Sequence, residues 1–405
     1  MNKTCVVHLS VDEIAGGAAR AANRIHNTLL EFGINSRMVV LYKYSDSDFV
    51  TSIRVNKVAL FFAIKINAFI RIIFASKKLG AFSAGLIGTL KVKNQKELKQ
   101  ADIISLHWVP GGFLSIFSIA KILNLGKPVV WRLPDTWPFS GGLHYSSSEK
   151  ELAAPLRFRL LSKFIIYLKY KLWNTKKLTI VCTNRWIESQ VRNSKVFEGA
   201  RIIKIATGVD LGQFKPLDQT TSRQKFNLPD KKRLVLFGAV NSFDDHRKGG
   251  DLLVEALLKL SQKISNNDQM PDIVIFGGSV VPNDLARVFN CHVVGILNEE
   301  EELAAIYNAC DVFVAPSREE ALANTVLEST ACGTPTVAFN IGGMPDSIVH
   351  KKTGYLANPY SIEDMAKGID FCLNSHGKMT NDCVNLSEKS FSLKKNVYEY
   401  IKLFG

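Results

Sequence analysis

The chain has 405 residues, of which 46% are hydrophobic and 22% are charged, with a formal net charge of +14. This length excludes a single ordinary core and suits two domains of about 150–200 residues each, and the composition is typical of a soluble globular enzyme. The charge is uneven: residues 1–205 hold 31 Lys and Arg against 12 Asp and Glu, whereas residues 206–405 hold 20 against 25. The basic first half is therefore expected to meet something anionic.

Apolar runs that predict strands alternate with helical patterns along both halves. The predicted strands are residues 4–9, 36–42, 102–108, 128–133 and 178–183, then 233–237, 272–276, 311–315 and 335–339. Such alternation predicts an α/β fold with one parallel sheet and its crossover helices in each half. We expect two facing Rossmann-like domains with a ligand cleft between them, residues 1–205 and 206–387, and a helix near 388–405 that packs back on the first.

Cysteine usage indicates a reducing compartment. The seven cysteines are scattered and form no C-x-x-C pair, and several lie in apolar runs typical of buried strands. We therefore expect reduced core thiols in a cytoplasmic protein, with no metal centre. The first ten residues hold one short apolar run followed by Asp12 and Glu13, which is not the pattern of a signal peptide.

Two loops have the composition of anion-binding sites. Gly16 and Gly17 follow the first predicted strand and open a helix, where glycines let the backbone approach a ligand and expose helix N–H groups. In the second half, Arg247 and Lys248 precede a helix that begins near Asp251. Two cations beside a helix start form a natural clamp for a diphosphate, and an ordinary basic loop is the alternative interpretation.

Residues 53–80 and 156–173 are at once apolar, aromatic and cationic. The longest uncharged run in the first is seven residues, far short of the ~20 that cross a bilayer. Each segment suits an amphipathic helix that covers the sheet of the first domain, or an interfacial helix whose aromatic side chains insert among lipid headgroups. Both interpretations can hold together, because one face can pack while the other meets lipid.

Within residues 316–335, the carboxylates Glu320 and Glu328 lie eight residues apart across a predicted strand-to-helix transition. Asn324 is the predicted N-cap of a helix over 325–332. The positive end of the helix dipole would then lie behind the backbone N–H groups of Leu322, Ala323, Asn324 and Thr325. A helix start that holds a phosphate, bracketed by carboxylates that accept sugar hydroxyls, predicts a nucleotide-sugar site.

This block, PSREEALANTVLESTACGTP, resembles the E-x7-E donor-site signature of the family 4 retaining glycosyltransferases, with Ala321-Leu322-Ala323 where Gly-Phe-Gly is usual. The resemblance implies the GT-B fold, a catalytic Glu320 that fixes the sugar, and a Glu328 that accepts ribose hydroxyls. It also implies that the loop of Gly16 and Gly17 faces the donor phosphates. Lys248 matches the lysine of the family's GRxxxxKG motif, Arg247 replaces the missing arginine, and Ile296 takes the place of the residue that packs on the base.

Residues 128–145, PVVWRLPDTWPFSGGLHY, resemble a segment of exopolysaccharide and lipopolysaccharide transferases that carries a His-Asp pair near the transferred sugar. Here the pair reads Pro134-Asp135. We expect the role of the lost histidine to pass to His107, with His144 or Asp135 next. The same resemblance places His144 and Trp137 in the acceptor region.

The sequence thus predicts a retaining, metal-independent and cofactor-free glycosyltransferase of bacterial surface polysaccharide synthesis. It would move a hexose-type sugar from a UDP- or GDP-linked nucleotide sugar to a lipid-linked saccharide acceptor, at the anionic inner face of the plasma membrane. Nucleic acid is disfavoured as a partner, because the basic residues interleave with aliphatic runs. The alternatives left open are a nucleotide-sugar epimerase on the same fold and a non-catalytic nucleotide-sugar-binding protein, which Pro134 favours.

Overall fold

The computed structural model describes residues 4–74, 79–146, 153–238, 243, 245–278 and 280–404. Residues 75–78, near the end of the basic-aromatic segment 53–80, and Ala239, where the family's arginine is missing, lie outside this part of the chain. The chain divides into two compact units. Unit 1 comprises residues 1–208 and 393–405, and unit 2 comprises residues 209–392.

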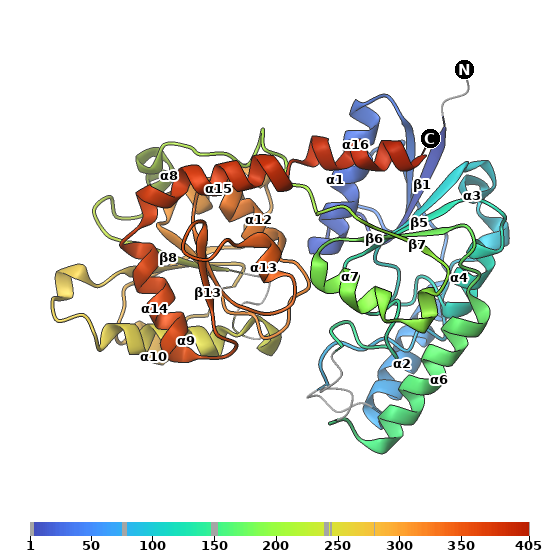
Figure 1. Ribbon diagram of the computed structural model, residues 1–405, viewed down its shortest axis with the longest axis horizontal. Helices are drawn as coiled ribbons and strands as arrows, with labels where there is room; N and C mark the ends of the chain where they lie inside the picture. Colours follow the sequence, from blue (N-terminus) through green and yellow to red (C-terminus); the bar gives the residue numbers. More distant parts are fainter. Residues whose placement is uncertain are drawn as a thin grey trace. The chain divides into compact units, whose positions relative to one another are not determined.

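Unit 1 is built on a seven-stranded parallel sheet in the order β3-β2-β1-β4-β5-β6-β7 (Figure 1). Its strands are β1 (Cys5–Asp12), β2 (Asn35–Tyr42), β3 (Val50–Ser52), β4 (Ile103–Leu106), β5 (Val129–Leu133), β6 (Leu178–Cys182) and β7 (Arg201–Lys204). Its helices are α1 (Gly17–Glu31), α2 (Lys57–Phe74), α3 (Lys96–Gln100), α4 (Ile116–Leu123), α6 (Leu156–Leu172), α7 (Arg185–Arg192) and α16 (Leu393–Phe404). The central strands β4 and β5 are buried along their whole length, as a parallel sheet covered on both faces requires.

The C-terminal helix α16 returns to unit 1 and lies beside α1 (Figure 1). It inserts Leu393, Val397, Tyr400 and Phe404 into the core cluster formed with strands of the unit 1 sheet. The helix begins five residues later than the expected 388, because residues up to Ser390 belong to the preceding helix α15 (His376–Ser390).

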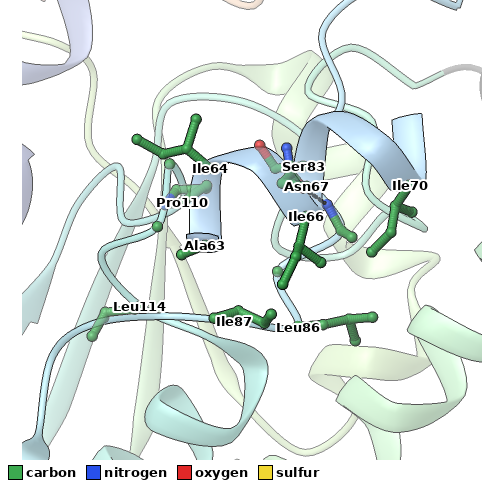
Figure 2. A pocket seen from close by; sticks show the side chains of 14 residues that line it. Ala63, Ile64, Ile66, Asn67, Ile70, Ser83, Leu86, Ile87, Pro110 and Leu114 are labelled. Atoms are coloured by element: carbon green, nitrogen blue, oxygen red, sulfur yellow. Dashed lines mark hydrogen bonds between the residues drawn. The ribbon is translucent and has the colours of Figure 1, made fainter. Parts of the chain in front are cut away.

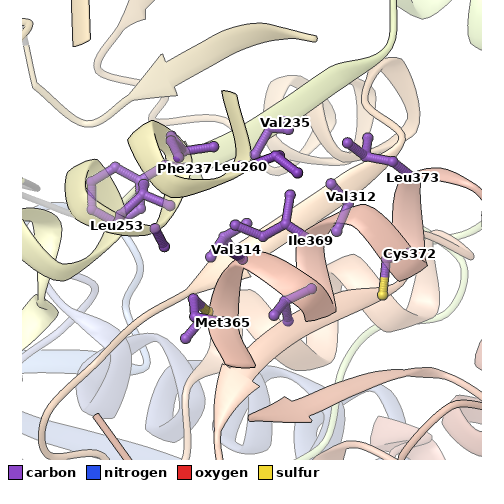
Figure 3. Close-up of a cluster of buried hydrophobic side chains, with 14 of the residues drawn as sticks. Val235, Phe237, Leu253, Leu260, Val312, Val314, Met365, Ile369, Cys372 and Leu373 are labelled. Atoms are coloured by element: carbon purple, nitrogen blue, oxygen red, sulfur yellow. The ribbon is translucent and has the colours of Figure 1, made fainter. Parts of the chain in front are cut away.

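Unit 2 has a six-stranded parallel sheet in the order β10-β9-β8-β11-β12-β13. Its strands are β8 (Leu234–Gly238), β9 (Asp272–Phe276), β10 (Cys291–Gly295), β11 (Val312–Ala315), β12 (Thr336–Phe339) and β13 (Gly354–Ala357). Its helices are α8 (Gln219–Lys225), α9 (Gly250–Ser261), α10 (Asn283–Ala286), α11 (Glu300–Ala309), α12 (Asn324–Ala331), α13 (Met344–Ser347), α14 (Ile362–Leu373) and α15. Figure 3 shows part of its core, where Val235, Val312 and Val314 of the sheet pack with Leu253 of α9 and Ile369 of α14.

Four strands escaped the sequence analysis, and each lies at an edge of its sheet: β3 and β7 in unit 1, β10 and β13 in unit 2. The nine predicted strands are the interior ones. An edge strand pairs on one side only and is often short and partly exposed, so its sequence needs no continuous apolar run. β7 and β10 illustrate this, since neither holds a fully buried residue.

A cluster of three buried histidines lies inside unit 1. His8 of β1 and His107, which follows β4, meet at 2.9 Å between ring nitrogens, and His26 of α1 contacts the Ser36 hydroxyl at 2.6 Å. Burial disfavours the imidazolium form, so the pKa of His26 falls to about 4 and that of His107 to about 3. Burial, reinforced by the neighbouring His107 and His26, also lowers the pKa of His8 well below its usual range. The three histidines are therefore uncharged in the folded protein.

These histidines predict acid sensitivity of the fold. Their folded-state pKa values lie below the value near 6.5 that they have in the unfolded chain. Below pH 6.5 the unfolded chain therefore binds more protons than the folded protein, and the free energy of unfolding decreases as the pH falls. The free energy of unfolding should drop by up to about 1.4 kcal/mol per pH unit for each histidine between pH 6.5 and about 4. Urea titrations at several pH values measure this slope. His26→Gln should flatten it and a His350→Gln control, at an exposed histidine, should not; equal slopes in both variants would contradict the assignment.

Candidate functional site

The predicted donor residues of unit 2 follow the carboxyl ends of three of its strands. Arg247 and Lys248 lie in the short 3-10 helix His246–Lys248 beyond β8, Ile296 directly follows β10, and Glu320 lies in the loop after β11. Since all strands of this sheet run parallel, these loops gather at one edge, where open α/β sheets bind their ligands.

Glu320 is the centre of a buried ion-paired cluster. Its carboxylate accepts a hydrogen bond from Lys248 Nζ at 2.8 Å and one from Arg247 Nη1 at 3.4 Å, and only 7% of its side chain is exposed. Burial acts to raise the pKa of this carboxyl, but the charges and hydrogen bonds of Lys248 and Arg247 outweigh burial, so the pKa lies below its usual range. The cluster is therefore charged, and it includes a second carboxylate, because Asp245 pairs with Arg247 Nη2 at 3.1 Å.

The two loops of the cluster are fixed to each other through their backbones. Gly249 has a φ of 69°, and a Cβ at this position would lie 2.0 Å from the Pro316 carbonyl oxygen, so only glycine permits this approach. Arg318 was not predicted as a site residue. Its backbone N–H donates to the Arg247 carbonyl at 2.8 Å, and its guanidinium makes two 2.6 Å bonds to Asp251 at the start of α9. Arg318 thereby holds the lysine loop against the glutamate loop.

Glu328 lies in the second turn of α12 and is buried. Its carboxylate accepts a hydrogen bond from the Tyr307 hydroxyl of α11 at 3.2 Å, a contact that the sequence did not indicate. The predicted capping of this helix was wrong. Ala323 is the N-cap, without a side-chain bond, and Asn324 is the first helical residue, because the helix begins one residue earlier than expected.

Leu322, Asn324 and Thr325 are half-buried at the start of α12, whereas Ala323 is buried. The isoleucine assigned to the base, Ile296, is 72% exposed and follows Gly295, whose φ is 79°. A large apolar side chain this exposed is available to pack on a planar ring. Ile296 directly follows β10, a strand that the sequence analysis did not predict.

In unit 1, the glycine loop lies between β1 and α1 as predicted from the sequence pattern. Gly16 is the N-cap of α1 with a φ of 86°, and a Cβ there would meet no atom within 4 Å, so backbone conformation alone calls for glycine. Asp12 closes the loop by accepting the Ala15 N–H at 2.7 Å, and Glu13 accepts two backbone N–H groups from Tyr44 and Ser45. Gly17 begins the helix.

The structure does not support His107 as the proton-transfer residue. The side chain is buried in the histidine cluster, and burial, together with Arg132, lowers its pKa to about 3. A general base or acid works best with a pKa near the operating pH and within reach of the substrate, and His107 satisfies neither condition. His107 was expected inside a strand over 102–108, but β4 ends at Leu106 and the side chain of His107 is buried.

Asp135, His144 and Trp137 lie together in one buried network. Asp135 contacts His144 Nδ1 at 2.6 Å and accepts from Trp108 Nε1 and the Trp137 backbone N–H, both at 2.9 Å. His144 Nε2 meets the Ser83 hydroxyl at 3.0 Å. Trp137 is almost fully buried, so no face of its ring is open to a saccharide, and its assignment to the acceptor region stays a prediction. These contacts anchor the loop after β5.

Part of unit 2 is similar in sequence to known glycosyltransferases. Residues 218–390 match the family model described as glycosyl transferases group 1. A D-inositol 3-phosphate glycosyltransferase from Corynebacterium aurimucosum is 30% identical over 187 residues, which cover 43% of this chain and 43% of that protein. The match thus spans less than half the length of this curated relative.

Solved structures are similar over the whole chain. The sucrose-phosphate synthase of Thermosynechococcus elongatus aligns with a TM-score of 0.70 at 16% identity, covering 99% of this chain and 98% of that one. The Anabaena protein HepE, solved in complex with UDP and glucose, aligns with a TM-score of 0.62 at 15% identity, covering 99% of each chain. The predicted fold class, two α/β domains with parallel sheets as in GT-B proteins, is confirmed, and residues 218–390 are similar to the group 1 glycosyltransferases.

The cluster predicts opposite effects for its charged members. Lys248→Ala should weaken the binding of a nucleoside diphosphate by about one to two decades in Kd, because a hydrogen bond to a charged group is worth ~1.5–3 kcal/mol. Glu320→Gln removes the negative charge beside both cations, so the same ligand should bind equally well or more tightly. Calorimetry with UDP and GDP measures both effects, with Lys259→Ala on α9 as the control. Equal weakening by Lys248→Ala and Glu320→Gln would contradict this division of roles.

Proposed function

We propose that this protein is a glycosyltransferase that takes a hexose-type sugar from a UDP- or GDP-linked donor. The observation that carries the proposal is the cluster of Lys248, Arg247 and Glu320 at the carboxyl edge of a parallel sheet, within a segment that matches the family model of the group 1 glycosyltransferases. The named activity of the curated relative supports glycosyl transfer, and the UDP bound to HepE supports a nucleotide-linked donor.

In this proposal, the diphosphate of the donor lies against Lys248 and Arg247. The lysine acts as a point charge and the arginine as a planar fork, and both stabilise the negative charge that grows on the leaving diphosphate. The start of α12 adds the positive end of a helix dipole. Glu320, adjacent to both cations, accepts hydroxyls of the sugar, and Glu328 accepts hydroxyls of the ribose.

The reaction that we propose retains the configuration of the sugar. The bond between the anomeric carbon and the diphosphate oxygen breaks, and the acceptor oxygen bonds to that carbon on the same face. The acceptor proton passes to the departing phosphate oxygen, so the step needs no protein nucleophile. Cations of the protein supply the charge that a metal ion would otherwise supply. With His107 buried, this route also needs no histidine.

We place the acceptor on a lipid carrier, as a saccharide of bacterial surface polysaccharide synthesis, with the protein attached peripherally to the cytoplasmic face of the membrane. The support is the basic first half, which suits an anionic surface.

The experiment that tests the function is an assay of several UDP- and GDP-linked hexoses with lipid-linked saccharide acceptors, with the product anomer assigned by NMR. We expect transfer with retention from at least one donor, and none from Glu320→Ala that still binds the free nucleotide. Binding of nucleotide without turnover of any donor would indicate a non-catalytic binding protein. Conversion of the nucleotide sugar without an acceptor would indicate an epimerase.

Glu328 gives a separate prediction. If it accepts ribose hydroxyls, Glu328→Gln should weaken the binding of the free nucleoside diphosphate and lower transfer together, by about one to two decades. Tyr307→Phe, which removes the hydroxyl that contacts Glu328, should reproduce a smaller part of the loss. Calorimetry with UDP and with 2′-deoxy-UDP distinguishes the ribose contact, because the variant should no longer discriminate between them. Full discrimination in Glu328→Gln would refute the assignment.

A further inference from the structure

Helix α2 leaves most of its apolar surface uncovered. Of its 18 residues only Ala63 is buried. Phe69 is 62% exposed and Ile72 76% exposed, and the other exposed large apolar residues are Val58, Phe61, Phe62, Ile64, Ile66 and Ile73. Soluble proteins rarely expose contiguous apolar surface on this scale without a partner. Packing against the rest of unit 1 therefore accounts for a small part of the apolar surface of α2.

The contacts that seat α2 on unit 1 are few. Ala63 packs over Gly112, and Asn67 accepts the Ala84 N–H at 2.7 Å. Figure 2 shows Ala63 and Ile66 of α2 across a cavity of about 80 Å³ from Leu86 and Ile87. Leu60 and Ile70 of the same helix are half-buried, whereas its exposed large side chains are available to another surface.

Helix α6 extends this surface, since it contacts α2 (Figure 1). Its inner face, at helical spacing, consists of Phe158, Ser162, Ile165 and Lys169, all buried. Its outer face repeats the same spacing with Leu156, Leu160, Phe164 and Tyr167, all exposed. A helix that packs on a core and meets water would carry polar residues on the outer face. We call the exposed residues of α2 and α6 together the apolar-basic face.

The charges on this face have one sign. Neither helix contains Asp or Glu, and the exposed cations are Lys57, Lys65, Arg71, Arg157, Lys163 and Lys171. Two copies of this chain that met symmetrically through the face would bring these cations together without a carboxylate to pair with them. An anionic lipid surface satisfies both features, because headgroups neutralise the cations while the aromatic rings enter the acyl boundary.

We propose that the apolar-basic face of α2 and α6 is the surface by which this protein docks on an anionic bilayer, with both helices lying in the plane of the headgroups. No helix in the described part of the chain is long and apolar enough to cross a membrane, so the face lies on the lipid rather than through it. The apolar-basic face is thus the part of the protein that would make the proposed membrane attachment. This proposal rests on the proposed function only for the lipid-linked acceptor.

The test is co-sedimentation of the full chain with vesicles of equal parts phosphatidylglycerol and phosphatidylcholine, and with vesicles of phosphatidylcholine alone. We expect binding to the anionic vesicles that weakens as salt shortens the Debye length below ~10 Å, and much weaker binding to the neutral ones. Lys65→Gln with Arg71→Gln should lower the partition coefficient about 25-fold, at about fivefold for each cation. Phe61→Ser with Phe69→Ser should abolish retention at every salt concentration.

Val288→Ser with Lys263→Glu in unit 2 is the matched control, since it changes an exposed apolar residue and an exposed cation away from the face. This control should sediment like the parent chain. Equal retention on neutral and anionic vesicles, or none on either, would overturn the proposal. A dimer that the Phe61→Ser, Phe69→Ser variant converts to monomer, without vesicle binding by the parent chain, would instead make the face an interface between copies.

UDP and GDP binding, measured on the same variants, separates this proposal from the proposed function. The face variants should bind nucleotide like the parent chain. Vesicle binding by a chain that binds no nucleotide and turns over no donor would refute the function and leave the docking surface standing.

Discussion

All strand pairs of both sheets run parallel, and this topology determines where the candidate site residues lie. Parallel strands place their carboxyl ends at one edge and need a crossover helix between them. In unit 2 the loops after β8, β10 and β11 therefore meet at the same edge, although they are separated by tens of residues. Lys248 reaches Glu320 across 72 positions of sequence because this topology brings their loops to the same edge.

Buried charge is handled differently in the two units. Glu320 stays ionised inside unit 2 because Lys248 and Arg247 offset the cost of removing its carboxylate from water. The histidine cluster of unit 1 is neutral, since burial favours the uncharged imidazole. The first arrangement holds charge where a charged ligand can use it. In unit 1, His107 was predicted from the sequence to be catalytic, but it belongs to the core. Its cluster makes the stability of the fold depend on pH.

The structure also decides which residues of helix α6 are exposed. Helix α6 carries large apolar residues on both its buried and its exposed face, so the hydrophobic pattern cannot say which face meets protein. The structure resolves this because Phe158 and Ile165 pack inward. What remains outside on α2 and α6 is apolar surface whose charged residues are all cations, as is typical of an interaction surface.

The sequence by itself determined the fold class, the nine interior strands and the positions of Glu320, Glu328, Arg247 and Lys248. Interior strands of covered parallel sheets are continuous apolar runs, and the E-x7-E spacing fixes a loop and a helix turn locally. Only the tertiary structure decided the four edge strands, the burial of His107 and Trp137, and the contacts of Tyr307 and Arg318. Edge strands lack an apolar signature because one side has no partner. Burial and long-range contacts depend on which elements the sheet brings together, and no local pattern records that.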